Sequence, residues 1–475
     1  MQTERSATVS REIGPTTGKL VERIMASHAG QFPSEARQCA HKFLIDSMLV
    51  GIAGTSNPAA DNILAVAQKW DQGQPGNCRV LGRSDVKLSP HSAAVINGFQ
   101  IHCLEWDGLH EPSVVIALCV TSAALISECQ EQDRDIDEVL KAFAVGVEVA
   151  VFFGAGSQSQ PKFFRPSTAG LMGAAIAIGL LRGFDAAQLT DLLGMAYSQA
   201  SGTMQAHWEG SETLPLQIGI AARAALSAAD LVAGGTGAPH DVVDGKFGYF
   251  KLIEEGGSLD PHFDAWCKPW KITEVAHKPF PAGRATQASL TALMDFAAQH
   301  SFSMDDINRF EASVPPLILL LVGRPWKLGM SPAYARLCLE FVVPQMIRNG
   351  RIDPRNFIDD VFNADQAKND AQRISVQLNE NRDPNALGPQ DISIELKDGR
   401  TFSCEVDAPF GSPDRPMTRE DQINKANFCF EIAGIPAQAE ALFEIGSEPG
   451  GGAQFGALLD MLCPQSQPSE RNSFR

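Results

Sequence analysis

The sequence has no apolar run long enough to cross a bilayer and no apolar segment at its start. The longest apolar run, Ala169 to Leu181, is about seven residues short of a membrane span. Residues 1–20 lack the apolar core of a secretory signal. We therefore expect a cytoplasmic protein that does not enter a membrane.

Basic residues are scarce relative to acidic ones. The chain has 39 Lys and Arg against 56 Asp and Glu, a formal net charge of −17. Such a chain repels a phosphate backbone, and no cluster of Lys and Arg reverses the sign locally. Nucleic acid is therefore not an expected partner.

Motifs for metals, nucleotides and hydrolytic serines are also missing. The ten cysteines stand singly, without a close-spaced pair or a Cys/His cluster at metal-ligand spacing. The sequence Gly234 to Gly237 follows a helical segment, so it is typical of a helix C-cap and not of a phosphate loop. There is no G-x-S-x-G motif. We expect mostly buried, reduced thiols, no metal and no cofactor.

The first part of the 475 residues, from about Gly18 to Leu252, is rich in alanine at helical spacing, with little strand-like alternation. Alanine allows close helix packing, so the composition predicts an all-helical layer. The predicted helices are Ser34–Ile52, Ala59–Trp70, Pro90–Cys103, Val114–Glu128, Ile136–Phe153, Thr168–Leu181, Ala186–Ser198 and Leu216–Ala233.

After Trp270 the pattern changes to short alternating runs. Predicted strands are Phe310–Val314, Ile374–Leu378, Ile392–Leu396 and Thr401–Val406, the last two joined by an Asp-Gly turn that indicates a hairpin. Predicted helices are Gln287–Gln299 and Ala333–Ile347, and Thr418–Cys463 returns to helical periodicity. The sequence thus predicts a mainly α fold: a helical domain (1–273 and 412–475) with an inserted α+β lid (274–411).

One segment concentrates groups that transfer protons. Residues 102–112 contain two histidines and three carboxylates with a Gly and a Pro. Neighbouring carboxylates and imidazoles shift each other's pKa values toward neutrality, which suits general acid/base catalysis. The alternative is a solvated loop with helix caps.

A second segment combines cations with stiff turns. His277, Lys278 and Arg284 surround two prolines just before a predicted helix, an arrangement that can bind a carboxylate. The alternative is a rigid interdomain linker.

Several short motifs recur in a fixed order along most of the chain. They are Phe43-Leu44-Ile45-Asp46-Ser47, Glu105-Trp106-Asp107 with Pro112, Arg165-Pro166-Ser167-Thr168-Ala169-Gly170, Gly245-Lys246-Phe247-Gly248, Lys278-Pro279-Phe280-Pro281 and Ser331-Pro332-Ala333. In these motifs the chain resembles the MmgE/PrpD family, which contains 2-methylcitrate dehydratase, cis-aconitate decarboxylase and iminodisuccinate epimerase. The resemblance implies a helical main domain with an α+β lid, a homodimer, and an active site between the domains that needs no metal or nucleotide.

The chain departs from the family at several motif positions. The usual Asp-x-Asp-Asp-Thr is here Glu105 to Leu109, and Val115 or Ile116 stands where a His is expected. A His becomes Arg165, and Lys-Pro-Leu-His becomes Leu214 to Gln217. A later His aligns with Gln287, and an aromatic hydroxyl is replaced by Phe341. Because a positioned acid or base is worth about two to four orders of magnitude in rate, citrate-type dehydration is not expected.

The resemblance and the residues together give an expected site. Glu105, Asp107, His110 and Lys278 are the candidate catalytic groups. Arg165, His207, His277, Arg284 and Gln217 are the candidates for binding a small carboxylate. His110 could instead cap its loop, His277 could hydrogen-bond the lid backbone, and Trp208 is expected to pack.

Three functional classes remain open at this point. The chain could be a cofactor-independent lyase or isomerase that acts on a small carboxylate. It could be an inactive carboxylate-binding or regulatory homologue that kept the pocket. It could also be a structural protein in which Arg165 and Lys278 only form ion pairs.

Overall fold

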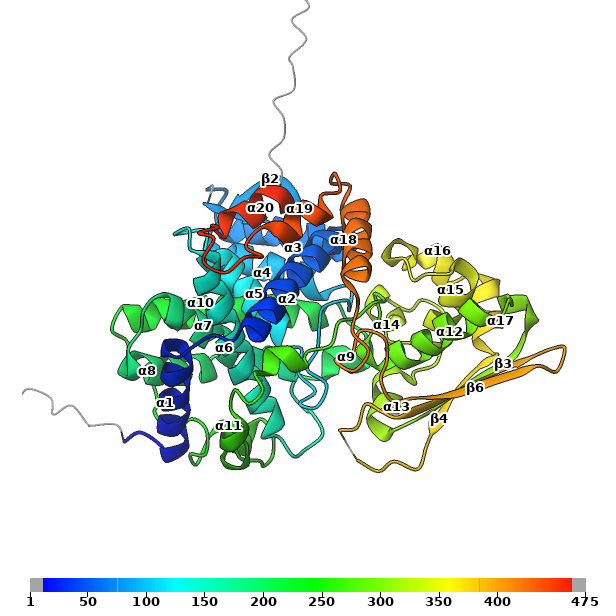
Figure 1. The fold of residues 1–475 in the computed structure, drawn as a ribbon, viewed down its shortest axis with the longest axis horizontal. Coiled ribbons are helices and arrows are strands. Elements are labelled where there is room, and N and C mark those ends of the chain that lie inside the picture. Colours follow the sequence, from blue (N-terminus) through cyan, green and yellow to red (C-terminus); the bar gives the residue numbers. More distant parts are fainter. Residues whose placement is uncertain (1–11, 75, 384, 464–475) are drawn as a thin grey trace, which may run out of the picture.

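Alanine-rich segments of the first part of the chain form one helical bundle. The computed structural model describes residues 12–74, 76–383 and 385–463. The bundle forms the larger of two lobes (Figure 1). Its helices are α1 Pro15–Ala29, α2 Ser34–Ala53, α3 Pro58–Trp70, α4 Pro90–His102, α5 Ala117–Glu128, α6 Ile136–Ala155, α7 Arg165–Leu181, α8 Ala186–Tyr197, α9 Gln205–Glu209, α10 Thr213–Ala233 and α11 Tyr249–Leu252.

Small residues bring the central helices into close contact. A Cβ atom on Gly98 of α4 would lie 2.7 Å from the Cα of Gly219 of α10. The two backbones therefore meet where neither helix carries a side chain. α10 is the one helix among the described residues that is long and apolar enough to cross a membrane. However, 56% of its most apolar window is buried, and it packs against α4 and α7, which accounts for its composition.

The smaller lobe holds a four-stranded mixed sheet with helices beside it (Figure 1). The sheet order is β4-β3-β5-β6, with β3 and β4 parallel and the other pairs antiparallel. Its strands are β3 Ile307–Val314, β4 Ile374–Leu378, β5 Gln390–Leu396 and β6 Thr401–Val406. Its helices are α12 Gln287–Gln299, α13 Pro316–Val322, α14 Pro332–Ala335, α15 Leu339–Asn349, α16 Asp359–Phe362 and α17 Asp365–Ala371.

The C-terminal segment returns to the helical lobe. It contains α18 Arg419–Ala433, α19 Ala439–Glu444 and α20 Gly456–Leu462. α18 begins at a capping box of Thr418 and Asp421 and packs on α2, where Lys425 Nζ lies 2.7 Å from Asp46 Oδ1. The predicted fold class, a helical main domain with an α+β domain, is confirmed.

Three local predictions differ from the structure. The helix predicted from Val114 begins at Ala117, because residues 114–116 belong to a loop and Val115 forms a β-bridge with His110. The helix predicted over 333–347 is divided between α14 and α15, because Cys338 forms a β-bridge with Gly323. A short hairpin of β1 Cys78–Val80 and β2 Arg83–Leu88 was not predicted.

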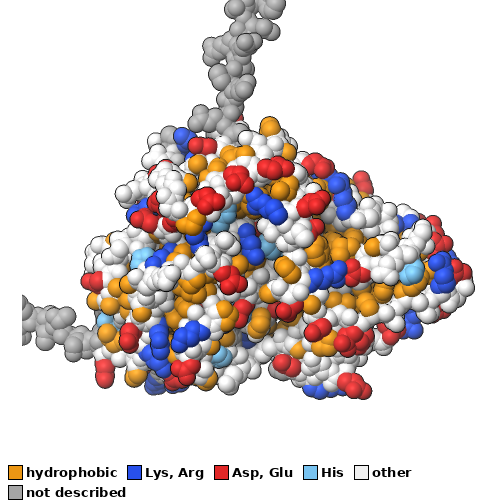
Figure 2. Space-filling model, in the orientation of Figure 1, with side chains coloured by type: hydrophobic (Ala, Val, Ile, Leu, Met, Phe, Trp, Pro, Cys, Tyr) orange, Lys and Arg blue, Asp and Glu red, His pale blue; other side chains and the backbone are white. Residues whose placement is uncertain are grey.

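Charges and thiols are distributed as in an ordinary globular protein. On the face drawn in Figure 2, acidic and basic side chains are interspersed, and the described residues form no continuous basic patch there. All ten cysteines are free, and most are buried, as predicted.

Candidate active site

The acidic motif lies on a strained loop. α4 ends at His102, and the loop continues to Ile116 before α5 begins. Glu105 and Val114 both have φ of 53°, in the left-handed region that favours glycine. Such residues cost about 1–3 kcal/mol each and occur where the surrounding structure holds them for function. The tertiary contacts of this loop therefore fix where Glu105 points.

Four titratable side chains form a buried cluster at this loop. Lys278, from the segment before α12, places Nζ 3.2 Å from Glu105 Oε2 and 3.7 Å from Asp107 Oδ1. His102 places Nδ1 3.0 Å from Asp107 Oδ1 and Nε2 3.4 Å from Glu105 Oε1. The side chains of His102, Asp107 and Lys278 are 0% exposed, and that of Glu105 is 11% exposed. The structure thus brings together three predicted catalytic residues and one that was not predicted.

Mutual charge stabilisation keeps this cluster ionised in spite of its burial. Burial raises the pKa of Glu105, but Lys278 and His102 lower it more, so the pKa lies below its usual range. The same balance of burial against His102 and Lys278 lowers the pKa of Asp107. Burial lowers the pKa of His102, but Asp107 and Glu105 raise it above its ordinary value. These directions favour ionised Glu105 and Asp107 and a protonated His102 beside the Lys278 side chain.

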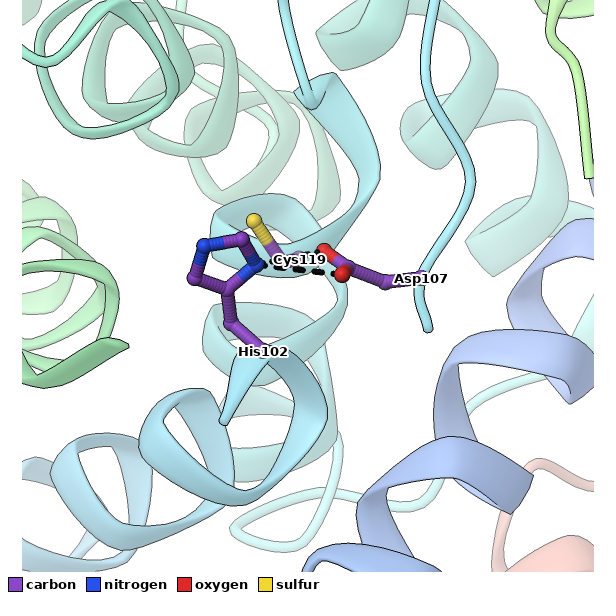
Figure 3. Close-up of side chains that lie close together, drawn as sticks. All are labelled: His102, Asp107 and Cys119. Carbon is purple, nitrogen blue, oxygen red and sulfur yellow. Dashed lines mark hydrogen bonds and ion pairs between the residues drawn. The ribbon is translucent and has the colours of Figure 1, made fainter. Parts of the chain in front are cut away.

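Cys119 of α5 lies beside the contact between His102 and Asp107 (Figure 3). Ligand atoms of His102, Asp107 and Cys119 lie within 4.8 Å of one another, a spacing that could suit a metal ion. However, burial raises the pKa of the Cys119 thiol well above its usual value, with a further rise from Asp107, so the thiol is neutral. The ammonium group of Lys278 beside Asp107 also disfavours a cation. The donor set therefore fits a proton-holding cluster better than a metal site.

His110 lies outside this cluster. Its Nδ1 is 2.8 Å from Ser113 Oγ, and its Nε2 is 3.1 Å from Glu274 Oε2. These contacts of His110, a predicted catalytic group, tie the loop to itself and to Glu274. This position favours the capping alternative over general acid/base catalysis.

A cavity of about 90 Å³ opens beside the cluster and is lined by both domains. The helical domain contributes Glu105, Leu109, Val114, Ile116, Pro161, Phe164, Arg165, Pro166, Met204 and His207. The α+β domain contributes Lys278, Gly283, Arg284, Ala285, Leu317, Leu321, Val322, Leu337 and Leu387. A larger hollow of about 1000 Å³ lies open at the surface beside β2 and contains no member of the cluster. The small cavity is therefore the candidate active site.

Arg165 lines the cavity, but its charge is already neutralised. Its Nη2 lies 3.1 Å from Glu254 Oε2, its Nε lies 3.1 Å from Glu254 Oε1, and Nη2 also donates to the carbonyl of Ser159 at 2.5 Å. The side chains of Arg165 and Glu254 are each 2% exposed. Such geometry favours a structural ion pair over the predicted carboxylate-binding role.

Arg284 and His277 have different positions although they lie close in sequence. Arg284 lines the cavity, and its Nε lies 2.5 Å from Glu111 Oε1, while its buried Nη2 has no hydrogen-bond partner among the described residues. His277 is buried outside the cavity lining and stacks on Phe43 with ring centroids 4.3 Å apart. The backbone N–H of His277 donates to the carbonyl of Gly411, a hydrogen bond that does not involve the ring.

His207 lines the cavity from α9 as a neutral ring. Burial lowers its pKa to about 4, with a further contribution from Arg324. Nη2 of Arg324 lies 3.2 Å from Nδ1 of His207, and an arginine can only donate. The ring proton therefore resides on Nε2, which leaves His207 as a hydrogen-bond donor.

Gln217 does not line the cavity. Its Oε1 accepts a hydrogen bond from the N–H of Thr203 at 2.6 Å, which fixes the turn before α9. A direct role in substrate binding is therefore not supported by this arrangement.

Two residues of the site were missed by sequence reasoning. His102 belongs to the segment 102–112 that concentrates titratable groups, but of its two histidines only His110 was chosen as a candidate. Arg324 gave no signal, because its contact with His207 spans 117 residues of sequence.

Comparison with known proteins agrees with this architecture. The MmgE/PrpD N-terminal domain matches residues 18–262, and the MmgE/PrpD C-terminal domain matches residues 280–445. The chain is 25% identical over 429 residues to cis-aconitate decarboxylase of Homo sapiens, covering 86% of each chain. It is 27% identical over 408 residues to the Mus musculus enzyme of the same name, covering 81% of this chain and 80% of that one. It is 24% identical over 424 residues to cis-aconitate decarboxylase of Aspergillus terreus, covering 83% and 84%.

The fold and the site define a two-domain protein whose acid/base cluster faces a small cavity between the domains. With both domain families matched in order, the chain belongs to the MmgE/PrpD family.

Proposed function

We propose that this protein is a lyase that acts on a small carboxylate by transferring a proton at carbon, with decarboxylation as its reaction. The observation that carries the proposal is the buried Glu105–Lys278 pair at the wall of a cavity that is lined mainly by apolar residues. Relatives named as cis-aconitate decarboxylases, at 24–27% identity, support the reaction class.

Within the cluster, the residues have separate roles. Glu105 and Lys278 line the cavity and would contact substrate, whereas Asp107 and His102 lie behind them. Lys278 would act as the proton donor and Glu105 would orient its ammonium group. Asp107 and His102 are positioning residues, since they contact Lys278 and Glu105 and do not line the cavity. Nε2–H of His207 would donate a hydrogen bond to a substrate oxygen.

The proposed step balances without a co-reactant. The bond between carbon and the departing carboxylate breaks, and its electron pair moves into the unsaturated acid that remains. CO₂ leaves, and the Lys278 ammonium gives one proton to carbon. The neutral amine then takes one proton from solvent before the next cycle.

The experiment is proton NMR in deuterium oxide with cis-aconitate, 2-methylcitrate, citrate, itaconate and amino-dicarboxylates, combined with detection of released CO₂. The proposal expects CO₂ release with one deuteron incorporated per product molecule. Dehydration or epimerisation in place of CO₂ release would replace decarboxylation by another lyase or isomerase reaction. Carboxylate binding without any turnover would instead establish an inactive binding homologue.

We further propose that the protein acts as a homodimer in the cytoplasm and without a cofactor, as family membership suggests. Sedimentation at micromolar concentration tests the dimer, because a species of 51.1 kDa would contradict it.

A further inference from the structure

The cavity offers few cations to a substrate. Three cationic side chains line it among the described residues, namely Arg165, Lys278 and Arg284. The Arg165 guanidinium already forms an ion pair with Glu254 and donates a hydrogen bond to the carbonyl of Ser159. Lys278 and Arg284 are therefore the two cations that a substrate carboxylate can reach.

The Arg284 guanidinium has one nitrogen without a hydrogen-bond partner among the described residues. Its Nε pairs with Glu111, but its Nη2 is buried without a hydrogen-bond partner among the described residues, and the residue is 7% exposed. A buried guanidinium nitrogen that makes no hydrogen bond is costly unless a ligand supplies an acceptor. Because Arg284 lines the cavity, a substrate carboxylate that draws the guanidinium toward it would satisfy this nitrogen.

Most of the remaining lining is hydrocarbon. Leu317, Leu321 and Val322 of α13 contribute to it, with Leu337 and Leu387 beside them. Leu320 of the same helix points outward and is 38% exposed. An ionised carboxylate against this lining would lose its water without gaining a partner, whereas an alkyl group would be buried favourably.

We propose that the substrate is an alkyl-substituted dicarboxylate and not a tricarboxylate. One carboxylate binds Nη2 of Arg284, the reacting carboxylate lies at Lys278 and Glu105, and the alkyl arm packs against Leu317 and Leu321. This inference rests on the proposed function for the identity of the reacting group, but the binding preference itself can be measured without turnover.

Two saturated succinate derivatives with the same number of non-hydrogen atoms serve as probes, because they differ only in the substituent at carbon 2. In 2-isobutylsuccinate, an isobutyl group replaces one carboxymethyl group of tricarballylate. Affinities are measured by isothermal titration calorimetry with the full chain at low ionic strength. We expect 2-isobutylsuccinate to bind at least tenfold more tightly.

Matched variants test whether the apolar lining causes the preference for 2-isobutylsuccinate over tricarballylate. Leu321→Lys puts a cation into the cavity and should shift the ratio of affinities at least tenfold toward tricarballylate. Leu320→Lys makes the same change at the exposed position of α13 and should leave the ratio unaltered. Arg284→Gln should weaken both probes to a similar extent, which provides a second test if Leu321→Lys fails to fold.

The binding results either support or overturn the proposed substrate class. Equal or tighter binding of tricarballylate to the natural chain overturns it, as does the absence of binding by both probes. Tight binding of 2-isobutylsuccinate with no turnover of any unsaturated dicarboxylate supports the inference and contradicts the proposed lyase function.

Discussion

Two buried cations at the same cavity differ in what surrounds them. Arg165 meets one carboxylate, Glu254, through two of its nitrogens and places a further hydrogen bond on a backbone carbonyl. Lys278 instead lies between Glu105 and Asp107, and both carboxylates also contact His102. The first arrangement is a closed pair, whereas the second is a network in which a proton can change place. Burial and charge alone therefore do not identify a catalytic cation, because the partners decide its availability.

The largest expected effect comes from removing the cation of the network. Lys278→Ala should lower turnover by about two to four orders of magnitude, because a positioned proton donor is lost. Steady-state kinetics and a thermal melt are measured together, with Lys397→Ala at an exposed position as the control. Turnover within tenfold of the natural chain would remove Lys278 from the reaction.

Breaking the closed pair should affect stability instead. Arg165→Met leaves Glu254 buried without its cation, which typically costs about 3–5 kcal/mol of the free energy of unfolding. The double variant Arg165→Met, Glu254→Leu should recover most of this loss. Urea denaturation measures the free energy of unfolding of the single and the double variant. A raised KM with unchanged stability would instead restore the carboxylate-binding role predicted for Arg165.

Glu148 offers a third type of buried carboxylate, one held by backbone N–H groups. It accepts hydrogen bonds from Cys267 and Lys271, each at 2.7 Å, and burial raises its pKa to about 7. The folded protein thus binds this proton more tightly than the unfolded chain does. Its contribution to stability, on the order of 3 kcal/mol, is present at low pH and is lost as the pH rises to about 7.

Glu148→Gln tests this contribution, because an amide cannot titrate. The fall in stability between pH 4.5 and 7, followed by urea denaturation, should be shallower in the variant than in the natural chain. An identical pH dependence in both proteins would show that Glu148 does not titrate in this range.

The smallest effect is expected at His110, which lies near the network without joining it. His110→Asn removes the contacts with Ser113 and Glu274 and should cost about 1 kcal/mol of stability, with turnover changed less than tenfold. Kinetics and a thermal melt measure both quantities. A loss of turnover comparable to that of Lys278→Ala would return His110 to the catalytic groups.

Sequence patterns predicted the elements that depend on a short stretch of the chain. The helical spacing of Ser34 to Ile52 and the Asp-Gly turn at Asp398 correspond to α2 and to the β5–β6 hairpin. The hairpin of β1 and β2 was missed because its turn, Leu81-Gly82, lacks the usual Asn-Gly or Asp-Gly signal. The divided helix at α14 and α15 depends on a bridge to Gly323, which no local pattern shows.

The candidate site could be predicted only in part. Glu105, Asp107 and Lys278 were chosen because the chain resembles a family with functional groups at those motifs, and the structure brings them together. Glu254, the partner of Arg165, lies 89 residues away in sequence. The sequence therefore did not show that the Arg165 guanidinium is already paired. The stacking of His277 on Phe43 joins residues that lie even farther apart in the sequence, so no local pattern could show it.

The most direct test of the contrast between network and pair is chemical rescue. Turnover of Lys278→Ala is measured in the presence of added methylammonium, and turnover of Arg165→Ala in the presence of added guanidinium. We expect methylammonium to raise the turnover rate of Lys278→Ala at least tenfold, whereas guanidinium should change the rate of Arg165→Ala less than twofold. No rescue of Lys278→Ala despite a folded protein, or a strong rescue of Arg165→Ala, would contradict the assignment of Lys278 as the reacting cation.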